Sequence, residues 1–290
     1  MSTAMSVGFR LPRETSEIRL LESALHHHCQ KRGYEEVMVP CQGAATKDNN
    51  RPLRGDLTQM MGLMVSRGYF TLGDEVRLRC SGPIFRGDSE GYQFSAELVN
   101  ASSPQSDTEV LTLAGEVMGI MGIGRATLIV GYPAALREML LAGGLTPEIA
   151  SQAENHLRRQ DLVSYGEVLR GTELSVAHRR ALSSIHRSMG LEECRKFLEE
   201  QHGLHCERMR RLIFELASLP EDPGISVNFG LTGSFDYYTG CVFQGHCGMA
   251  GRPVLTGGRY MIHEQPSVGF AVEIDAVVEA REVTRSASRS

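Results

Sequence analysis

Polar side chains that could hold a small ligand occur in short, glycine-rich stretches of this chain. They include two carboxylates, an amide, a hydroxyl and a tyrosine ring, at Asp56, Glu97, Gln93, Thr58 and Tyr260. Such groups supply the negative charge and hydrogen-bond acceptors that a buried ammonium group needs, because an unpaired buried charge is costly. Arg86 adds a cation whose planar fork matches carboxylate and phosphate oxygens.

The elements that must position these side chains begin with a helix after Pro12. Apolar residues there, from Ile18 to Cys29, recur at three- and four-residue steps, and Gly33 is a natural stop. A capping box at Ser106–Glu109 predicts the start of a helix that runs to Met121. A further helix is expected from Pro133 to Leu141 and another from Ala276. Strands are expected at Val37–Val39, Val76–Cys80, Phe94–Val99, Ala126–Val130, Ile225–Leu231, Tyr238–Phe243 and Ser267–Ile274.

Between these strands, residues 146–220 show dense charge and helical periodicity, which predicts a helical insertion. Strands separated by turns, with helices gathered at the beginning, middle and end, favour an α+β fold with an antiparallel sheet. We expect one domain over residues 1–290 and a disordered tail at 283–290.

Composition and charge exclude some function classes. Hydrophobic residues make up 41% and charged residues 22% of the chain, with a formal net charge of -5. A nucleic-acid-binding protein usually has a basic face, and this balance does not favour one. No apolar run has the length of a membrane helix, and seven scattered cysteines without CxxC spacing suit reduced thiols in the cytoplasm.

Six stretches in a fixed order carry a family resemblance. They are Leu53–Thr58, Gly82–Asp88, Gln93–Glu97, Phe235–Phe243, Thr256–Tyr260 and Ser267–Ala271. They resemble the catalytic domain of histidyl-tRNA synthetases and, more closely, its non-catalytic relative, the regulatory subunit of ATP phosphoribosyltransferase. The resemblance runs from Leu11 to about Glu279 and implies a class II aminoacyl-tRNA-synthetase-like fold.

The resemblance implies a histidine-binding pocket. The implied residues are Asp56, Thr58, Arg86, Gln93, Glu97, Tyr237, Tyr238 and Tyr260. Chemically the set fits, because a neutral imidazole needs both a hydrogen-bond donor and an acceptor. Taken singly, Glu97 on a strand is more often solvent-facing, and a tyrosine pair is more often one core and one surface ring. The order of the motifs favours the pocket.

Departures from the synthetases concern the adenylation chemistry. Gly233 and Ala276 stand where the synthetases have arginines that stabilise charge at the α-phosphate. Asp88 stands where they have a glutamate. The loop between Arg86 and Gln93 is short and contains no arginine. The chain also ends near Ser290, without room for an anticodon-reading domain. The departures match the regulatory subunit, which implies no enzymatic activity and no cofactor.

The predicted partner is the short-form catalytic subunit of ATP phosphoribosyltransferase, bound by a class II-type homodimer built on residues 13–40 and responsive to histidine. Two other functions stay open: a free-standing enzyme that activates histidine or a similar amino acid, and an RNA-binding regulator.

No metal site is expected, because His26 and Cys29 share a helix face without an evident third ligand. The segment 41–52 is short for the regulatory subunits and puts the ligand affinity in question.

Overall fold

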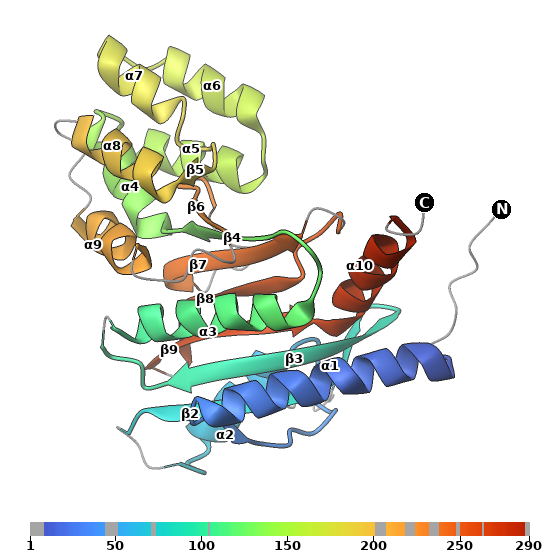
Figure 1. Cartoon of the computed structure of the whole chain (residues 1–290). Helices are drawn as coiled ribbons and strands as arrows, with labels where there is room; N and C mark the ends of the chain where they lie inside the picture. The colour runs from blue at the N-terminus through green and yellow to red at the C-terminus, as the bar shows by residue number, and fades with distance from the viewer. Residues whose placement is uncertain are drawn as a thin grey trace.

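The computed structural model describes residues 9–43, 52–70, 74–103, 105–200, 207–217, 224–231, 238–247, 250–262 and 264–287. In these residues the strands form one sheet in the order β1-β2-β3-β9-β8-β7-β4-β6-β5 (Figure 1). The strands are β1 (Glu35–Glu36), β2 (Val76–Arg86), β3 (Ser89–Val99), β4 (Ala126–Gly131), β5 (Met189–Gly190), β6 (Gly224–Val227), β7 (Tyr238–Cys247), β8 (Leu255–Ile262) and β9 (Gln265–Glu273).

The helices flank this sheet and confirm the α+β prediction. They are α1 (Pro12–Lys31), α2 (Leu57–Ser66), α3 (Gln105–Met121), α4 (Pro133–Ala142), α5 (Pro147–Arg158), α6 (Leu162–Arg170), α7 (Val176–Leu182), α8 (Leu191–Glu200), α9 (Glu207–Leu216) and α10 (Ile274–Ala287). The sheet is antiparallel as expected, except that β1 pairs parallel with β2 and β4 pairs parallel with β6.

The two faces of the sheet are covered unequally. On one face α1 and α3 run side by side and, with α10, bury the larger apolar core, which includes Leu21, Phe94 and Val268 (Figure 1). On the other face the short helix α2 covers a small cluster around Leu57, Met61 and Leu78. Because successive residues of a strand point to opposite faces, β3 presents Phe94, Ala96 and Leu98 to the large core and leaves Gln93, Ser95 and Glu97 for the other face.

The β2–β3 hairpin is longer than predicted. A strand end at Cys80 was wrong: β2 continues through Pro83 to Arg86 and pairs with β3 along its whole length. Proline is tolerated there because β1 pairs with β2 only as far as Arg79, so that β2 is an edge strand beyond this residue. Gly87, at φ +60°, then allows a tight turn into β3.

Other element boundaries also differ from expectation. The strand predicted at Val37–Val39 is wrong, because the strand that pairs with β2 is Glu35–Glu36 and ends where Val37 donates its amide to the Arg79 carbonyl. The strand expected to reach Leu231 ends at Val227, whereas β7 extends beyond Phe243 to Cys247. At Gly257 and Gly258 the sequence left a strand or a tight turn open, and the structure has strand β8 there. Helix α2 was not predicted, because its apolar residues, such as Leu57, Met60 and Met61, do not form a single stripe.

The predicted capping box does not form at the start of α3. Ser106 Oγ lies 3.3 Å from a Glu75 carboxylate oxygen, and Glu109 accepts hydrogen bonds from Arg77 at 2.7 Å. The amide of Gln105 instead donates to the Ser103 hydroxyl at 3.2 Å. A tertiary ion pair therefore replaces the local interaction that the sequence suggested.

Helices α5 to α9 lie between β4 and β6 in the chain, within the segment where a helical insertion is expected, and α5 to α8 gather beyond β4 at one end of the molecule (Figure 1). At the C-terminal end, α10 continues to Ala287, into the segment 283–290 for which we expected disorder. Among the described helices, none is long and apolar enough to span a bilayer.

Candidate ligand-binding site

On the α2 side of the sheet, small residues form a surface with polar side chains at its edges. We call this surface the floor of the site. One cross-strand row consists of Glu97 on β3, Gly269 on β9, Gly258 on β8 and Val242 on β7. On one side of it, Tyr260 on β8 pairs with Tyr238 on β7. The glycines remove side chains from the centre of this surface, so that the polar groups around it can converge.

Two glycines of the floor are required by close packing. A Cβ atom at Gly269 would overlap the Glu97 carboxylate and would lie 2.6 Å from the Ala96 carbonyl oxygen. A Cβ atom at Gly258 would lie 2.7 Å from the Tyr238 ring. Both contacts are shorter than atomic radii allow, so any larger residue would displace the side chain above it. The floor therefore fixes the positions of Glu97 and Tyr238.

Glu97 is the buried acid of the site. Only 1% of the residue is exposed. Its carboxylate accepts a hydrogen bond from Thr58 Oγ1 at 2.6 Å and another from the Tyr260 hydroxyl. Burial raises the pKa of Glu97 to about 8. The two hydrogen bonds lower this pKa, and the negative charge of Asp56 raises it by a smaller amount. Among the described residues, no cation pairs with this carboxylate.

Asp56 and Thr58 reach the site because helix α2 begins there. The Asp56 side chain caps the helix by accepting a hydrogen bond from the Gln59 amide at 3.2 Å. Burial raises the pKa of Asp56, although hydrogen bonds from Gln59 and Thr58 and the charge of Arg86 oppose this effect. Two partly or fully buried carboxylates therefore lie near each other with raised pKa values, which makes the site attractive to a cationic group.

The start of α2 is held by Arg54, a buried arginine that sequence reasoning did not single out. Its guanidinium donates to the carbonyl of Pro83 at 2.8 Å and to the carbonyls of Val39 and Pro40 at 2.5 and 3.1 Å. One guanidinium nitrogen lies directly over Gly82, where a Cβ atom would be 2.5 Å away. Arg54 thus ties the segment before α2 to β2 and to the chain after β1.

Gln93 and Arg86 converge on a third acid, Glu273, at the other end of the floor. Gln93 Nε2 donates to Glu273 Oε1 at 3.1 Å, while the Leu57 amide donates to Gln93 Oε1 at 3.0 Å. Arg86 Nη2 lies 3.0 Å from the same Glu273 oxygen. Sequence reasoning missed Glu273, which lies two residues beyond the quoted motif Ser267–Ala271 and has only its acidic character as a signal.

The cavity between these groups is small. Its volume is about 20 Å³, and its lining includes Asp56, Thr58, Glu97, Tyr238 and Tyr260. This volume holds about one water molecule. A ligand of amino-acid size must therefore displace the Thr58–Glu97–Tyr260 cluster, or move the side chains around it, before it can enter.

The predicted site residues fall into two groups. The structure brings Asp56, Thr58, Glu97, Tyr238 and Tyr260 together around the cavity. Gln93 and Arg86 lie at the adjacent Glu273 end and are bonded to that acid. Tyr237, Gly233 and Ser234 lie outside the described residues. Their roles in ligand binding stay predictions.

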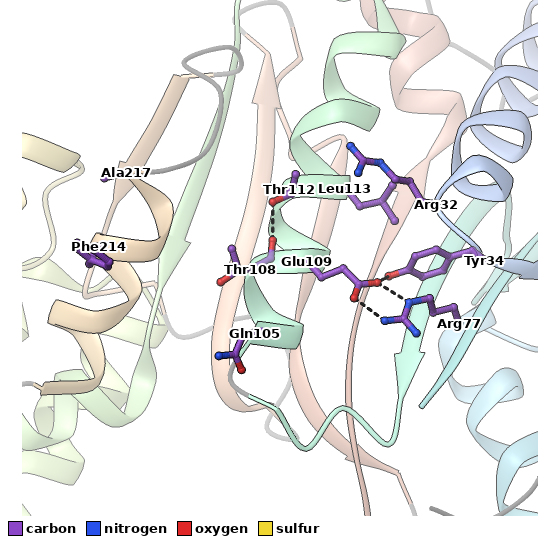
Figure 2. Close-up of a pocket in the computed structure, with 10 residues that line it drawn as sticks. All are labelled: Arg32, Tyr34, Arg77, Gln105, Thr108, Glu109, Thr112, Leu113, Phe214 and Ala217. Atoms are coloured by element: carbon purple, nitrogen blue, oxygen red, sulfur yellow. Dashed lines mark hydrogen bonds and ion pairs between the residues drawn. The ribbon is translucent and has the colours of Figure 1, made fainter. Parts of the chain in front are cut away.

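A larger hollow of about 880 Å³ lies on the opposite face of the sheet, between α3 and α9 (Figure 2). Figure 2 shows the Glu109 carboxylate directed toward both Arg77 and Tyr34, with Phe214 of α9 across the hollow. The Arg77–Glu109 pair, at 2.7 Å, neutralises the charge at this wall. Of the predicted histidine-binding residues that the structure describes, none lines this hollow.

The histidine-cysteine segment of α1 is built into the fold. His26 is within hydrogen-bond distance of Ser81 at 2.9 Å and of Arg79 at 3.1 Å, so both of its ring nitrogens have partners. Cys29 is fully buried, and burial raises the pKa of its thiol to about 12. In the described part of the chain, no three histidine, cysteine or acidic side chains gather as metal ligands would.

The sheet, its helices and the site between β3, β8, β9 and α2 define a class II aminoacyl-tRNA-synthetase-like protein. The family described as "Histidyl-tRNA synthetase" matches residues 53–277. The chain therefore belongs to the histidyl-tRNA synthetase family.

Similar proteins refine the relation within the family. The ATP phosphoribosyltransferase regulatory subunit of Moorella thermoacetica is 28% identical over 316 residues, covering 96% of this chain and 81% of that protein. A structure described as an ATP phosphoribosyltransferase regulatory subunit/histidyl-tRNA synthetase from Bacillus halodurans superposes with a TM-score of 0.81 at 21% identity, over 97% of this chain and 83% of the other. A chain of the ATP phosphoribosyl transferase (HisG:HisZ) complex from Thermotoga maritima gives a TM-score of 0.71 at 16% identity, over 89% and 97%.

Proposed function

We propose that this protein is a non-catalytic regulatory subunit of ATP phosphoribosyltransferase, acting in the first step of histidine biosynthesis and in its feedback by histidine. The name of the Moorella relative, which matches along most of both chains, supports this role. The likeness to a chain of the Thermotoga complex is consistent with assembly on a short-form catalytic subunit, a glycosyltransferase.

The observation that carries the proposal is the state of Glu97. Burial of a carboxylate without a cation is unfavourable unless the group is protonated or a ligand supplies the charge. A histidine molecule offers an ammonium group and an imidazole ring, both of which can donate to this oxygen pair. Tyr260 and Thr58, already hydrogen-bonded to Glu97, would then keep the carboxylate oriented toward the ligand.

The geometry offers little support for adenylation. Arg86 is engaged by Glu273 and by the carbonyl of Gly55 at 3.1 Å. The turn between β2 and β3 is tight, since Arg86 pairs directly with Ser89. Asp275, at the position where the synthetases have glutamate, accepts a hydrogen bond from the Tyr92 amide at 2.6 Å and pairs with Arg10. The acid is therefore used to hold β3, α10 and the N-terminal segment together.

Calorimetric titration with histidine tests the pocket. We expect Glu97→Ala to weaken binding by about 10- to 100-fold, because loss of a charged hydrogen-bond partner costs about 1.5–3 kcal/mol. Cys41→Ser, at an exposed cysteine, is the matched control and should bind like the wild type. Equal affinity of Glu97→Ala and wild type would remove Glu97 from the site.

Assembly with the partner is tested on the purified proteins. The chain should co-elute with the catalytic subunit from the same source and raise its activity. Absence of both effects at micromolar concentrations would contradict the regulatory role. With a net charge of -5, we expect no salt-sensitive tRNA binding. The six cysteines within the described residues are free thiols, which supports a reducing cytoplasmic location.

A second candidate is amino-acid activation, which the half-exposed guanidinium of Arg86 favours. Histidine-dependent exchange between ATP and pyrophosphate is its test. We expect no exchange above background, and a clear signal would replace the regulatory proposal with an enzymatic one.

We also propose a homodimer formed through residues 13–40. Strand β1 is the edge of the sheet, and the adjoining Met38 is 91% exposed. A second copy that covers this edge would bury Met38 and the unpaired backbone groups of β1. Such cover is one way in which proteins protect an edge strand from unwanted pairing.

A further inference from the structure

The Arg86–Glu273 pair controls the charge at one end of the site. Arg86 is at the end of β2, and 46% of its side chain is exposed, whereas Glu273, at the end of β9, is 14% exposed. The guanidinium donates through Nη2 to Glu273 and through Nε to the Gly55 carbonyl. Two of its donors are thus used inside the protein, on the side that faces the floor.

Glu273 is held in place by more than this arginine. Its Oε1 also accepts from Gln93, whose other amide atom accepts from the Leu57 backbone at the start of α2. The chain of contacts connects β2, β3, β9 and α2, and Gln93 is 1% exposed. These hydrogen bonds hold the Glu273 carboxylate beside the guanidinium of Arg86.

The charge balance follows from these positions. Asp56, Glu97 and Glu273 contribute acidic groups around the floor, and Arg86 is the cation that the described residues place beside them. A phosphate or other dianion at Arg86 would have to break the ion pair and then lie beside the Glu273 carboxylate. Like charges at such short range repel strongly where water is partly excluded.

We propose that Glu273 is a specificity-determining residue, an internal counter-ion that occupies Arg86 and closes this end of the site to phosphate-bearing ligands. The site then binds an amino acid, whose ammonium group is positively charged, in preference to nucleotides and pyrophosphate. The identity of the accepted ligand rests on the proposed histidine-binding function. Exclusion of phosphate is a separate property with its own readout.

The test is binding of inorganic pyrophosphate and of ATP to the full chain, measured by calorimetry at low salt. Glu273→Gln keeps the shape and the hydrogen-bond acceptor but removes the charge. We expect it to bind both probes at least about tenfold more tightly than the wild type, with an affinity that falls as salt is added. Adding Arg86→Gln to Glu273→Gln should abolish the gain.

Glu90→Gln is the matched control, because Glu90 is an exposed acid of the β2–β3 hairpin that carries Arg86, and its loss changes the net charge equally. It should bind the probes as weakly as the wild type. Thermal melting establishes that each variant is folded, and Glu273→Ala provides a second neutral side chain if the glutamine variant melts early.

The proposal is overturned if Glu273→Gln gains no affinity, if Glu90→Gln gains as much, or if the wild type already binds pyrophosphate well. Histidine titration of the same samples separates this result from the proposed function. A variant that gains pyrophosphate binding in a protein that never binds histidine would contradict the histidine site and leave the role of Glu273 intact.

Discussion

At the scale of single residues, the site depends on a carboxylate in an unusual state. Glu97 lies on a strand, where a glutamate ordinarily faces solvent, yet it is buried and bonded to Thr58 and Tyr260. The resemblance placed Glu97 in a ligand pocket and thus away from solvent; the burial is observed, and the ligand stays a prediction. The raised pKa could not be anticipated, because it depends on burial under α2 and on the nearby Asp56.

The ionisation of Glu97 predicts how stability depends on pH. Its pKa is raised in the folded protein from 4.5 to about 8, so the folded state binds a proton over this range that the unfolded state releases. The contribution of Glu97 to the free energy of unfolding is therefore fully present below pH 4.5 and is lost as the pH rises toward 8. Chemical denaturation of the ligand-free protein from pH 5 to 8 measures it.

Glu97→Gln is the corresponding control, because glutamine cannot ionise. The decline of stability with rising pH should be smaller in Glu97→Gln than in the wild type. Parallel curves for the two proteins would mean that Glu97 is already ionised in the folded state.

Gly269→Ala tests the floor beneath Glu97. The added methyl group would overlap the carboxylate and crowd the Ala96 carbonyl, so Glu97 must move away from Thr58 and Tyr260. We expect a loss of about 1–3 kcal/mol in the free energy of unfolding, together with weaker histidine binding. Gly119→Ala in α3 is the control: its Cβ would contact nothing within 4 Å, and the change should be neutral or slightly stabilising. Equal stability of the two variants would contradict the packing described for Gly269.

At the scale of elements, sequence patterns predicted the helix bounds that local interactions determine. The apolar stripe of α1 and the proline at its start gave bounds that the structure confirms. Predictions failed where tertiary contacts decide. The bounds of α3 are confirmed, but the Arg77–Glu109 pair replaces its capping box, and the sheet edge admits Pro83 into β2. For strand β8 the sequence left a strand or a tight turn open at Gly257 and Gly258, because glycines weaken the strand pattern, and the structure has the strand.

Arg54→Lys tests how α2 is positioned. Lysine cannot make the forked contacts to the carbonyls of Val39, Pro40 and Pro83, and it would leave some of them unpaired in a buried place. We expect a loss of about 1–3 kcal/mol in stability, and histidine affinity should fall as well, because Asp56 and Thr58 follow closely in the chain. Arg67→Lys, at the exposed end of α2, should change neither property. Normal affinity in a destabilised Arg54→Lys would show that α2 keeps its place without this anchor.

At the scale of the whole molecule, the class II synthetase-like fold is confirmed, and the likeness between motifs extends to the arrangement of the sheet. What the sequence could not indicate is the small size of the cavity, since about 20 Å³ leaves no room for an amino acid. The space is filled by Thr58, Glu97 and Tyr260, which come from different elements and meet only in the folded protein. Feedback by histidine would then require a second, open arrangement with higher affinity for the ligand.

Met38→Glu tests the homodimer proposed for residues 13–40. A charge at this exposed position would be buried without a partner at the β1 edge. We expect light scattering to report a dimer for the wild type and a shift toward monomer in the variant. The same change at Val176, which is 85% exposed on α7 in the helical segment, should leave the dimer intact. A dimer that withstands Met38→Glu would place the interface elsewhere.

The most direct test of the regulatory role is the activity of the catalytic ATP phosphoribosyltransferase subunit across a histidine titration, measured alone, with the wild-type chain and with Glu97→Gln. We predict that the wild-type chain raises the activity and makes it sensitive to histidine. Glu97→Gln should still raise the activity but shift inhibition to about 10-fold or more higher histidine. A histidine response that is the same without this chain would contradict the account.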